Sequence, residues 1–354
     1  MLSRIATFAA PARREFMVGT MQAQLNRLVG EVSTGRKADP IAELGSGASL
    51  LYQLQAQSDR QGALQTSITM ASHRLDTAQA ALSSLEGITR TVANTVQGWT
   101  SSMNQGMAVV AEQASSTMNT AVNVLNTSHV GGAVFGGSVS DVPPMRASDA
   151  PGGMEEMATA LLDAAVAAKG GPLDQSDIAG LMADFERVFD DTHPDPALRY
   201  AGGAYVGATD GEPTRVMIGT SQSVQYDTSA NQAPVRDLMR GLSMLSLLDV
   251  ATSRMDETGK KELLTQAGTV LRGASNDLTV LQGSLGAIQG RLSDAADAQR
   301  TAAQATETRI LSYVEADSYG NATKISMLQT QLQATYALTA QISQLSMVRY
   351  MPSV

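Results

Sequence analysis

Residues 319–351 read YGNATKISMLQTQLQATYALTAQISQLSMVRYM, and the rest of the chain is organised around them. The only charged side chains in this stretch are those of Lys324 and Arg349, and apolar residues recur at helical spacing. The pattern predicts a long, nearly uncharged helix. Its apolar stripe drifts, because Leu338 and Ile342 lie well round the cylinder from the leucines before them. Two interpretations remain open: an amphipathic helix on a monomer's core, or an assembly helix that other subunits complete.

The other end of the chain offers a partner for this helix. Its apolar residues follow spacings of three and four, and Gly35 then suits the left-handed conformation just past a helix end. We therefore predict a terminal helical pair built from residues 1–40 and 316–354. The residues between these two segments would then leave the terminal helical pair and return to it. The apolar residues of the N-terminal segment are Met17, Met21, Leu25, Leu28 and Val32.

Two heptad patterns occupy the middle of the chain. The first runs from Leu50 to about Thr127 without a proline, with possible breaks at Gly87, Gly98 or Gly106. A second, from Leu271 to Val314, has a length suited to pairing with it. The fold class is therefore mainly α: a long antiparallel helical bundle or coiled-coil rod made from both halves of the chain. We assign residues 41–134 and 235–315 to this bundle. The strictest part of the first seam is Leu64, Ile68, Ala71, Leu75, Ala78, Leu82 and Leu85.

Residues 135–234 are predicted to form an inserted distal domain of mixed α and β structure. The glycine-rich stretch 129–139 is β-like, and its glycines permit a tight hairpin. Helices are expected at 154–169 and 178–189, the second capped by Ser176 or Asp177. Short strands are expected at 204–206, 215–219 and 223–226.

Composition excludes several classes of function. The net charge of −9 argues against nucleic-acid binding, which needs clustered Lys and Arg. No segment approaches the roughly 18 apolar residues of a membrane span. Arg13-Arg14 superficially resembles a twin-arginine signal, but Gln22 and Asn26 stand where an apolar region would follow. We therefore expect no cleaved signal peptide, and no disulfide, since the sequence has no cysteine.

The sequence also lacks a recognisable catalytic or metal site. His73, His129 and His193 are dispersed, and no zinc or phosphate-binding motif is present. The stretch 190–195, DDTHPD, comes closest to a set of metal ligands but lacks the alternating oxygens of a calcium loop. We interpret it as a solvated loop. No catalytic residue, cofactor or metal is predicted, and the protein is not expected to be an enzyme.

Both ends of the chain resemble the flagellin family of bacterial flagellar axial proteins. Residues 25–37, LNRLVGEVSTGRK, are similar to the family's first helix, which ends in S-[ST]-G-[KR]. Residues 325–351 are similar to the closing helix of the hook-associated members, which ends near S-L-x-x-Y-L. Each motif is short, and their joint placement carries the resemblance.

A further motif points to one branch of that family. The stretch from Phe135 through Gly136 and Gly137 to Pro143 is similar to the F-x-G-x-x-x-x-x-P stretch of hook-associated protein 3. The resemblance implies a structural protein at the hook–filament junction, in a ring of identical subunits. Its implied partners are the hook-side junction protein, flagellin and a cytoplasmic export chaperone at the C-terminal region. Its implied location is the extracellular flagellum, reached by type III export without signal cleavage.

The terminal pair would form the inner core of the flagellum and remain disordered before assembly. A filament-forming flagellin is the nearest alternative, and a cytoplasmic coiled-coil adaptor is a more distant one. The stripes and family positions together give the expected assembly residues: Met21, Leu25, Leu28, Val32, Ile325, Leu328, Leu332, Tyr336, Leu338, Ile342, Leu345 and Val348.

Overall fold

The computed structural model describes residues 2–99, 106–130, 132–139, 141–208, 213–251 and 253–348. The chain divides into two compact units, each described here by itself. Unit 1 contains residues 1–62 and 300–354, and unit 2 contains residues 63–299. The fold is mainly helical, as predicted, with a few short strands. None of the described helices is long and apolar enough to cross a membrane.

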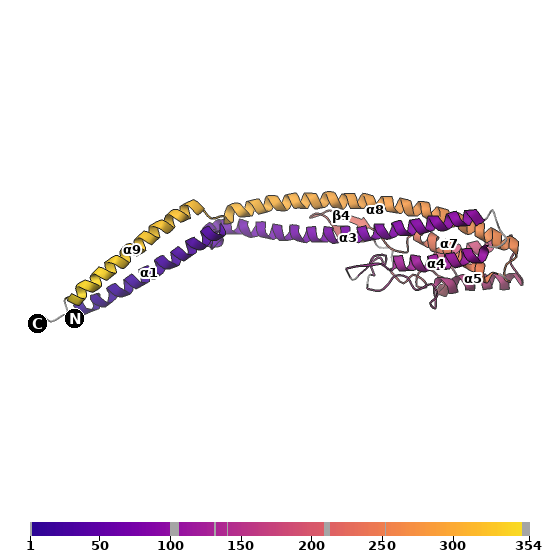
Figure 1. The fold of residues 1–354 in the computed structure, drawn as a ribbon, viewed down its shortest axis with the longest axis horizontal. Coiled ribbons are helices and arrows are strands. Elements are labelled where there is room, and N and C mark those ends of the chain that lie inside the picture. Colours follow the sequence, from indigo (N-terminus) through magenta and orange to yellow (C-terminus); the bar gives the residue numbers. More distant parts are fainter. Residues whose placement is uncertain are drawn as a thin grey trace. The chain divides into compact units, whose positions relative to one another are not determined.

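Unit 1 is built on the two terminal helices, α1 (Leu2–Thr34) and α9 (Ser318–Val348), which lie side by side (Figure 1). The predicted terminal helices are therefore both present. Gly35 follows α1 at φ +67°, the left-handed conformation expected there. Pro40 then opens the short helix α2 (Pro40–Leu44), whose first turn is capped by the Asp39 carboxylate accepting from the Ala42 N–H. A 3₁₀ turn, η1 (Gly45–Gly47), leads into α3.

The heptad seams form the long helices α3 (Ala48–Trp99) and α8 (Glu257–Val314). Within unit 2 these helices are antiparallel. Gln289 Nε2 donates to Asp76 Oδ1 over 2.8 Å, and Ser275 donates to Glu86 over 3.2 Å. Of the predicted strict seam, all but Leu64 are buried, and Leu64 is half-buried. The α3 pattern continues in α4 (Met107–Leu125).

The remaining helices of unit 2 pack around α7 (Ala233–Val250), which contacts α4, α5 (Met154–Lys169) and α6 (Ile178–Phe189). A stack of aromatic rings lies beside them: Tyr200 stacks on Phe189 at 5.3 Å and on Tyr205 at 5.8 Å between ring centroids. The Tyr200 hydroxyl donates to the Ala230 carbonyl over 3.0 Å, and its burial raises the pKa of this phenol. The stack therefore fastens the connection before α7 to the end of α6.

Two small antiparallel hairpins complete unit 2. Strand β1 (Ser128–His129) pairs with β2 (Gly132–Ala133), and β3 (Thr214–Met217) pairs with β4 (Ser223–Tyr226). A short 3₁₀ turn, η2 (Pro196–Leu198), lies between α6 and β3.

Of the three possible breaks, α3 passes through Gly87 and ends one residue after Gly98, and α4 begins one residue after Gly106. Other local predictions were wrong. The segment 204–206 is no strand, because Tyr205 makes only isolated bridges to Met145 and Ala201. Asp177 begins α6 without capping it, since its carboxylate accepts instead from the Asp174 N–H and from Lys169.

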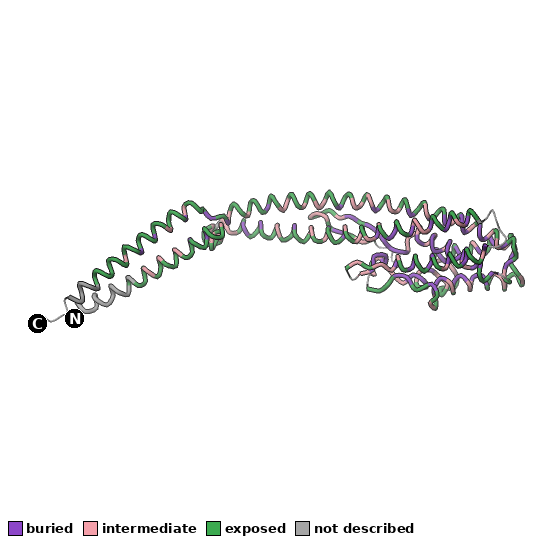
Figure 2. Tube along the Cα trace, viewed as in Figure 1, coloured by how far each residue is buried: buried purple, intermediate pink, exposed green. Residues whose placement is uncertain are grey.

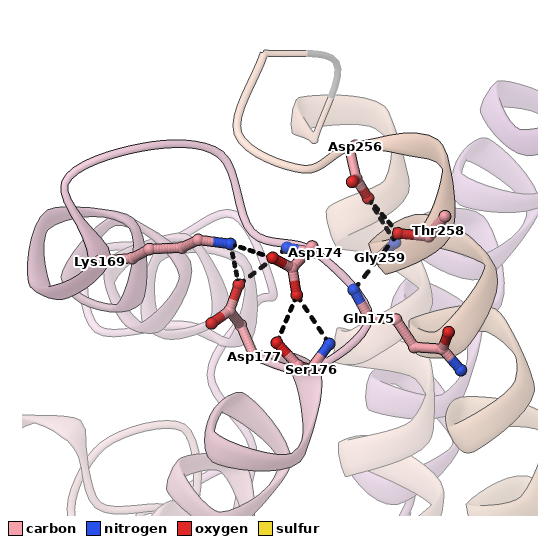
Figure 3. Close-up of polar contacts among 8 residues, drawn as sticks. All are labelled: Lys169, Asp174, Gln175, Ser176, Asp177, Asp256, Thr258 and Gly259. Carbon is pink, nitrogen blue, oxygen red and sulfur yellow. Dashed lines mark hydrogen bonds and ion pairs between the residues drawn. The ribbon is translucent and has the colours of Figure 1, made fainter.

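The connection between α5 and α6 is fastened to the start of α8 by what we name the connector latch: Lys169, Asp174, Asp177 and Asp256 (Figure 3). Lys169 Nζ lies 2.7 Å from Asp174 Oδ2 and also bonds Asp177, and it holds the pKa of Asp174 well below its usual value. The N–H of Gly259 donates to Asp256 over 2.8 Å and lowers the pKa of that carboxyl.

The backbone joins the two halves of the latch. The Leu173 N–H donates to the Arg254 carbonyl, and the Asp256 N–H donates to the Leu173 carbonyl, each over 2.9 Å. A Cβ at Gly259 would lie 2.7 Å from the Leu173 carbonyl oxygen, so this close approach requires glycine.

Candidate assembly interface

The terminal pair buries only a narrow strip of apolar surface. Leu28 of α1 and Leu328 and Leu332 of α9 are buried, and Gln22 Nε2 donates to the Tyr336 hydroxyl over 2.8 Å. Met21, Leu25 and Ile325 are half-buried. The pair is therefore held by a seam one side chain wide, as the drifting stripe of α9 predicts.

Most described residues of the pair are exposed (Figure 2). Large apolar residues are among them. Four of the predicted assembly residues belong to this exposed set: Val32, Tyr336, Leu338 and Ile342, with exposed fractions from 36% to 58%. The side chains of Leu345 and Val348 lie outside the described part of the chain. The predicted residues thus fall into two groups, one that holds α1 to α9 and one that faces outward. Tyr336 belongs to both, because it is half exposed and its hydroxyl accepts from Gln22.

Sequence analysis missed further outward-facing residues. Phe16 is 76% exposed, Met327 is 59% exposed, and Val29 is also exposed. The sequence did contain a signal for these residues, namely the drift of the apolar stripe around the terminal helices. An apolar residue that lies off the seam of a two-helix pair has no partner within the chain. Met17, assigned by spacing to the N-terminal seam, is exposed as well.

The polar face of α9 presents few unsatisfied hydrogen-bond donors and few charges. The hydroxyls of Thr323, Thr330, Thr335 and Thr339 donate to carbonyls four residues earlier in the same helix. Each hydroxyl hydrogen therefore already has an acceptor, so covering this face with another helix leaves few donors unsatisfied. Lys324 is the only charged side chain that the described part of α9 presents. Burying this face of α9 against a neighbouring chain therefore costs little desolvation free energy, because few charged groups lose their water.

A set of polar contacts, which we name the connector clasp, fixes where α1 ends and α9 begins. It consists of Glu31, residues 35–37, residues 313–316 and Asn321. The Lys37 N–H donates to the Val314 carbonyl over 2.8 Å, and the Ala316 N–H donates to the Gly35 carbonyl over 3.0 Å. The buried Glu31 carboxylate accepts from the Ala38 N–H over 3.1 Å and from Asn321 Nδ2 over 2.8 Å. The clasp sets the register between the terminal helices.

The glycine motif that suggested one branch of the family is an interior turn. Phe135 is buried, and the Ala230 N–H donates to its carbonyl over 2.8 Å. A Cβ at Gly136 would lie 1.9 Å from the Val139 carbonyl oxygen, and Gly137 has φ +67°. Phe135, Gly136, Gly137 and Pro143 lie outside the described strands, and the nearby hairpin is formed by β1 and β2 before them.

The loop with the most metal-like sequence uses its carboxylates on the chain itself. Asp191 accepts from the Ala201 N–H over 2.7 Å, and Asp195 accepts from the Ala197 N–H over 2.9 Å. Among the described residues no group of three or more histidine, aspartate or glutamate side chains is placed to hold a metal ion. The exposed apolar face of the terminal pair is thus the strongest candidate for function.

Comparison with known proteins identifies family models of helical regions at both ends of the chain. The bacterial flagellin N-terminal helical region matches residues 7–139, and the bacterial flagellin C-terminal helical region matches residues 268–351. Among curated proteins no sequence matches the chain. The chain is similar to the crystal structure of FlgL from Bacillus cereus, with 12% identity and a TM-score of 0.34, over 82% of this chain and 99% of that one.

The assignment rests on the two helical regions, which together match more than half of the sequence and include most of α1 and all of α9. Members of this family are structural proteins that assemble into flagellar polymers. The chain belongs to the bacterial flagellin family.

Proposed function

We propose that this flagellar structural protein forms the junction between hook and filament, as a ring of identical subunits. The proposal of assembly is supported by the outward apolar face of the terminal pair, where Phe16, Met327 and Leu338 are all more than half exposed. A two-helix seam cannot cover these side chains, whereas neighbouring copies can. The protein acts by packing and not by catalysis.

The junction role, as opposed to the filament itself, is supported by the stretch from Phe135 to Pro143. Its sequence is similar to hook-associated protein 3, and its glycines are required by the turn that they form. The proposed partners at the two faces of the ring are the hook-side junction protein and flagellin. Filament-forming flagellin remains the second candidate, because the helical regions are common to the whole family.

Before assembly the outward apolar residues of α9 need protection from other partners. We propose that a cytoplasmic export chaperone covers this C-terminal region, and that the chain leaves by type III export without signal cleavage. The terminal pair would be unfolded in the isolated chain and fold when neighbours bury its second face.

Immunogold labelling of purified hook–filament structures tests the proposal. The antibody is raised against residues 145–230, which belong to unit 2. We expect one labelled band where the hook meets the filament, and no band in cells that lack the gene. Label along the whole filament would identify a flagellin. Label confined to the cytoplasm would favour the coiled-coil adaptor.

A further inference from the structure

The most exposed methionines lie on the two terminal helices. Among the methionines whose side chains the structure describes, Met17 of α1 and Met327 of α9 are the most exposed, at 59% each. Since the sequence has no cysteine, methionine is the only amino acid of this chain that presents sulfur to an oxidant. The buried methionines, by contrast, all belong to unit 2: Met118, Met145, Met154, Met157, Met239, Met244 and Met255.

Met327 lies on a part of α9 that is suited to apolar packing. It lines a shallow, mostly apolar hollow of about 420 Å³, together with Ser326, Thr330, Gln331 and Ala334. The Thr330 hydroxyl donates to the Ser326 carbonyl over 2.9 Å, so its hydrogen is not free to bond a group placed beside it. A neighbouring chain that covers this hollow therefore gains chiefly by burying apolar surface.

Oxidation would change the polarity of the methionine side chain much more than its size. Hydrogen peroxide takes two electrons from the thioether sulfur and transfers one oxygen atom to it, and water is released. The product is methionine sulfoxide, a polar side chain that disrupts apolar interfaces. Its oxygen accepts hydrogen bonds from water. An apolar neighbour that covers the sulfoxide removes these bonds without replacing them, and this opposes association.

We propose that Met17 and Met327 form a modification site, at which peroxides convert methionine to methionine sulfoxide and so block incorporation of the chain. The site is open before assembly and closed after it, because the neighbours that bury the outward face of the terminal pair also cover both sulfur atoms. An unfolded terminal pair, as proposed for the free chain, would expose both sulfur atoms further. This inference rests on the proposed self-assembly and adds a chemical control to it.

The first test compares the incorporation of oxidised and unoxidised chains. Purified chain is treated with hydrogen peroxide, the peroxide is removed with catalase, and the chain is added to isolated hook structures from cells that lack the gene. Peptide mass spectrometry gives the sulfoxide content at each methionine. We expect sulfoxide at Met17 and Met327 and an at least several-fold loss of incorporation. Methionine sulfoxide reductases A and B with dithiothreitol should restore incorporation, which distinguishes sulfoxide from other peroxide damage.

Variants assign the effect to these two sulfur atoms. Leucine is close to methionine in volume but has no sulfur, so the double variant Met17→Leu, Met327→Leu should incorporate equally with and without peroxide treatment. The matched control, Met70→Leu with Met217→Leu, removes two exposed methionines of unit 2 and should remain sensitive to peroxide. The inference would be overturned if the first double variant were as sensitive as the unchanged chain.

A further measurement needs no variant. Intact hook–filament structures and the free chain are exposed to the same dose of peroxide, and sulfoxide is quantified at each methionine. Met17 and Met327 should be oxidised in the free chain and protected in the structures. Equal oxidation of both residues in the two states would contradict their closure by neighbouring chains.

These outcomes separate the inference from the function on which it rests. If the unoxidised chain does not incorporate into hook structures, the proposed junction role fails. If it incorporates, and chain with sulfoxide at both Met17 and Met327 incorporates equally well, only the modification site fails.

Discussion

Two glycines on helices of unit 2 have opposite surroundings and should respond oppositely to alanine. A Cβ at Gly241 would lie 2.7 Å from both Cγ and Cδ2 of Leu271, whereas nothing lies within 4 Å of one at Gly273. We expect Gly241→Ala to lower the free energy of unfolding by about 1–3 kcal/mol through overpacking. Gly273→Ala should raise it by about 0.5–1 kcal/mol, because alanine favours the helix. Urea unfolding of the two variants measures both changes. A change of the same sign in the free energy of unfolding of both variants would contradict the packing of α7 on α8.

Glu31 is the residue on which the connector clasp depends. Glu31→Ala would leave the Ala38 N–H and the buried Asn321 amide without their acceptor, and the loss at Asn321 alone should cost about 1–3 kcal/mol. Hydrogen exchange, read by mass spectrometry on the assembled protein, should then accelerate around residues 35–38 and 314–321. Glu15→Ala changes an exposed carboxylate of α1 and serves as the control. Unchanged hydrogen exchange in the Glu31→Ala variant would contradict the role of the connector clasp in setting the register between α1 and α9.

Single residues were also where sequence reasoning failed most clearly. Gly87 was a candidate break, but one glycine costs a helix only about 1 kcal/mol, and the Ser275–Glu86 contact beside it helps to hold α3 to α8. A contact from a distant part of the chain therefore accompanies a helix that continues through this glycine. The tight hairpin expected in the glycine-rich stretch 129–139 is present, since β1 and β2 pair at its start.

Among elements, the α5–α6 connection should be the acid-sensitive one. The folded pKa of Asp174 and of Asp256 is depressed, so their contribution to stability is fully present above the ordinary value of 3.8 and is lost as pH falls through the lower, folded values. Asp174→Asn should therefore lower the melting temperature at pH 6 and lower it by less at pH 2, where part of the contribution of the Asp174 charge is already lost. Asp294→Asn, an exposed position on α8, is the control. An equal loss at both pH values would contradict the role of the Asp174 charge.

Long elements were predicted well, and of the three short strands the two expected at 215–219 and 223–226 are present as β3 and β4, whereas 204–206 is not a strand. The 4-3 spacing from Ile68 to Leu85 identified a buried seam, because a helix that repeats apolar residues over many turns has few alternatives. The segment 204–206 has a strand-like composition, yet Tyr205 is fixed by its ring stack and by its hydroxyl, which lies 2.8 Å from that of Ser229. The outward residues of the assembly interface were only partly predicted, since spacing shows which residues are apolar and not which lack a partner.

For the whole molecule, both groups of assembly residues should be required for incorporation. Ile342→Asp places a charge on the outward face and should abolish incorporation into hook–filament structures while leaving the melting of unit 2 unchanged. Leu332→Asp should also block incorporation, because it places a charge in the seam that holds α1 to α9. Incorporation is measured by immunoblot of purified structures. Val280→Asp exchanges an exposed valine of unit 2 and should incorporate normally, and equal incorporation of the Ile342 variant would contradict the outward face.

Unit 1 is assembled from the two extremes of the sequence, and this has a consequence for the time course of synthesis. A ribosome adds about 5–20 residues per second, so tens of seconds pass between the completion of α1 at Thr34 and the appearance of α9 at Ser318. Unit 2 can fold in that interval, because all of its residues precede α9. Helix α1 has to wait for α9 and, by the proposed assembly, for neighbouring chains, and a nascent chain that stalls early can never close the pair.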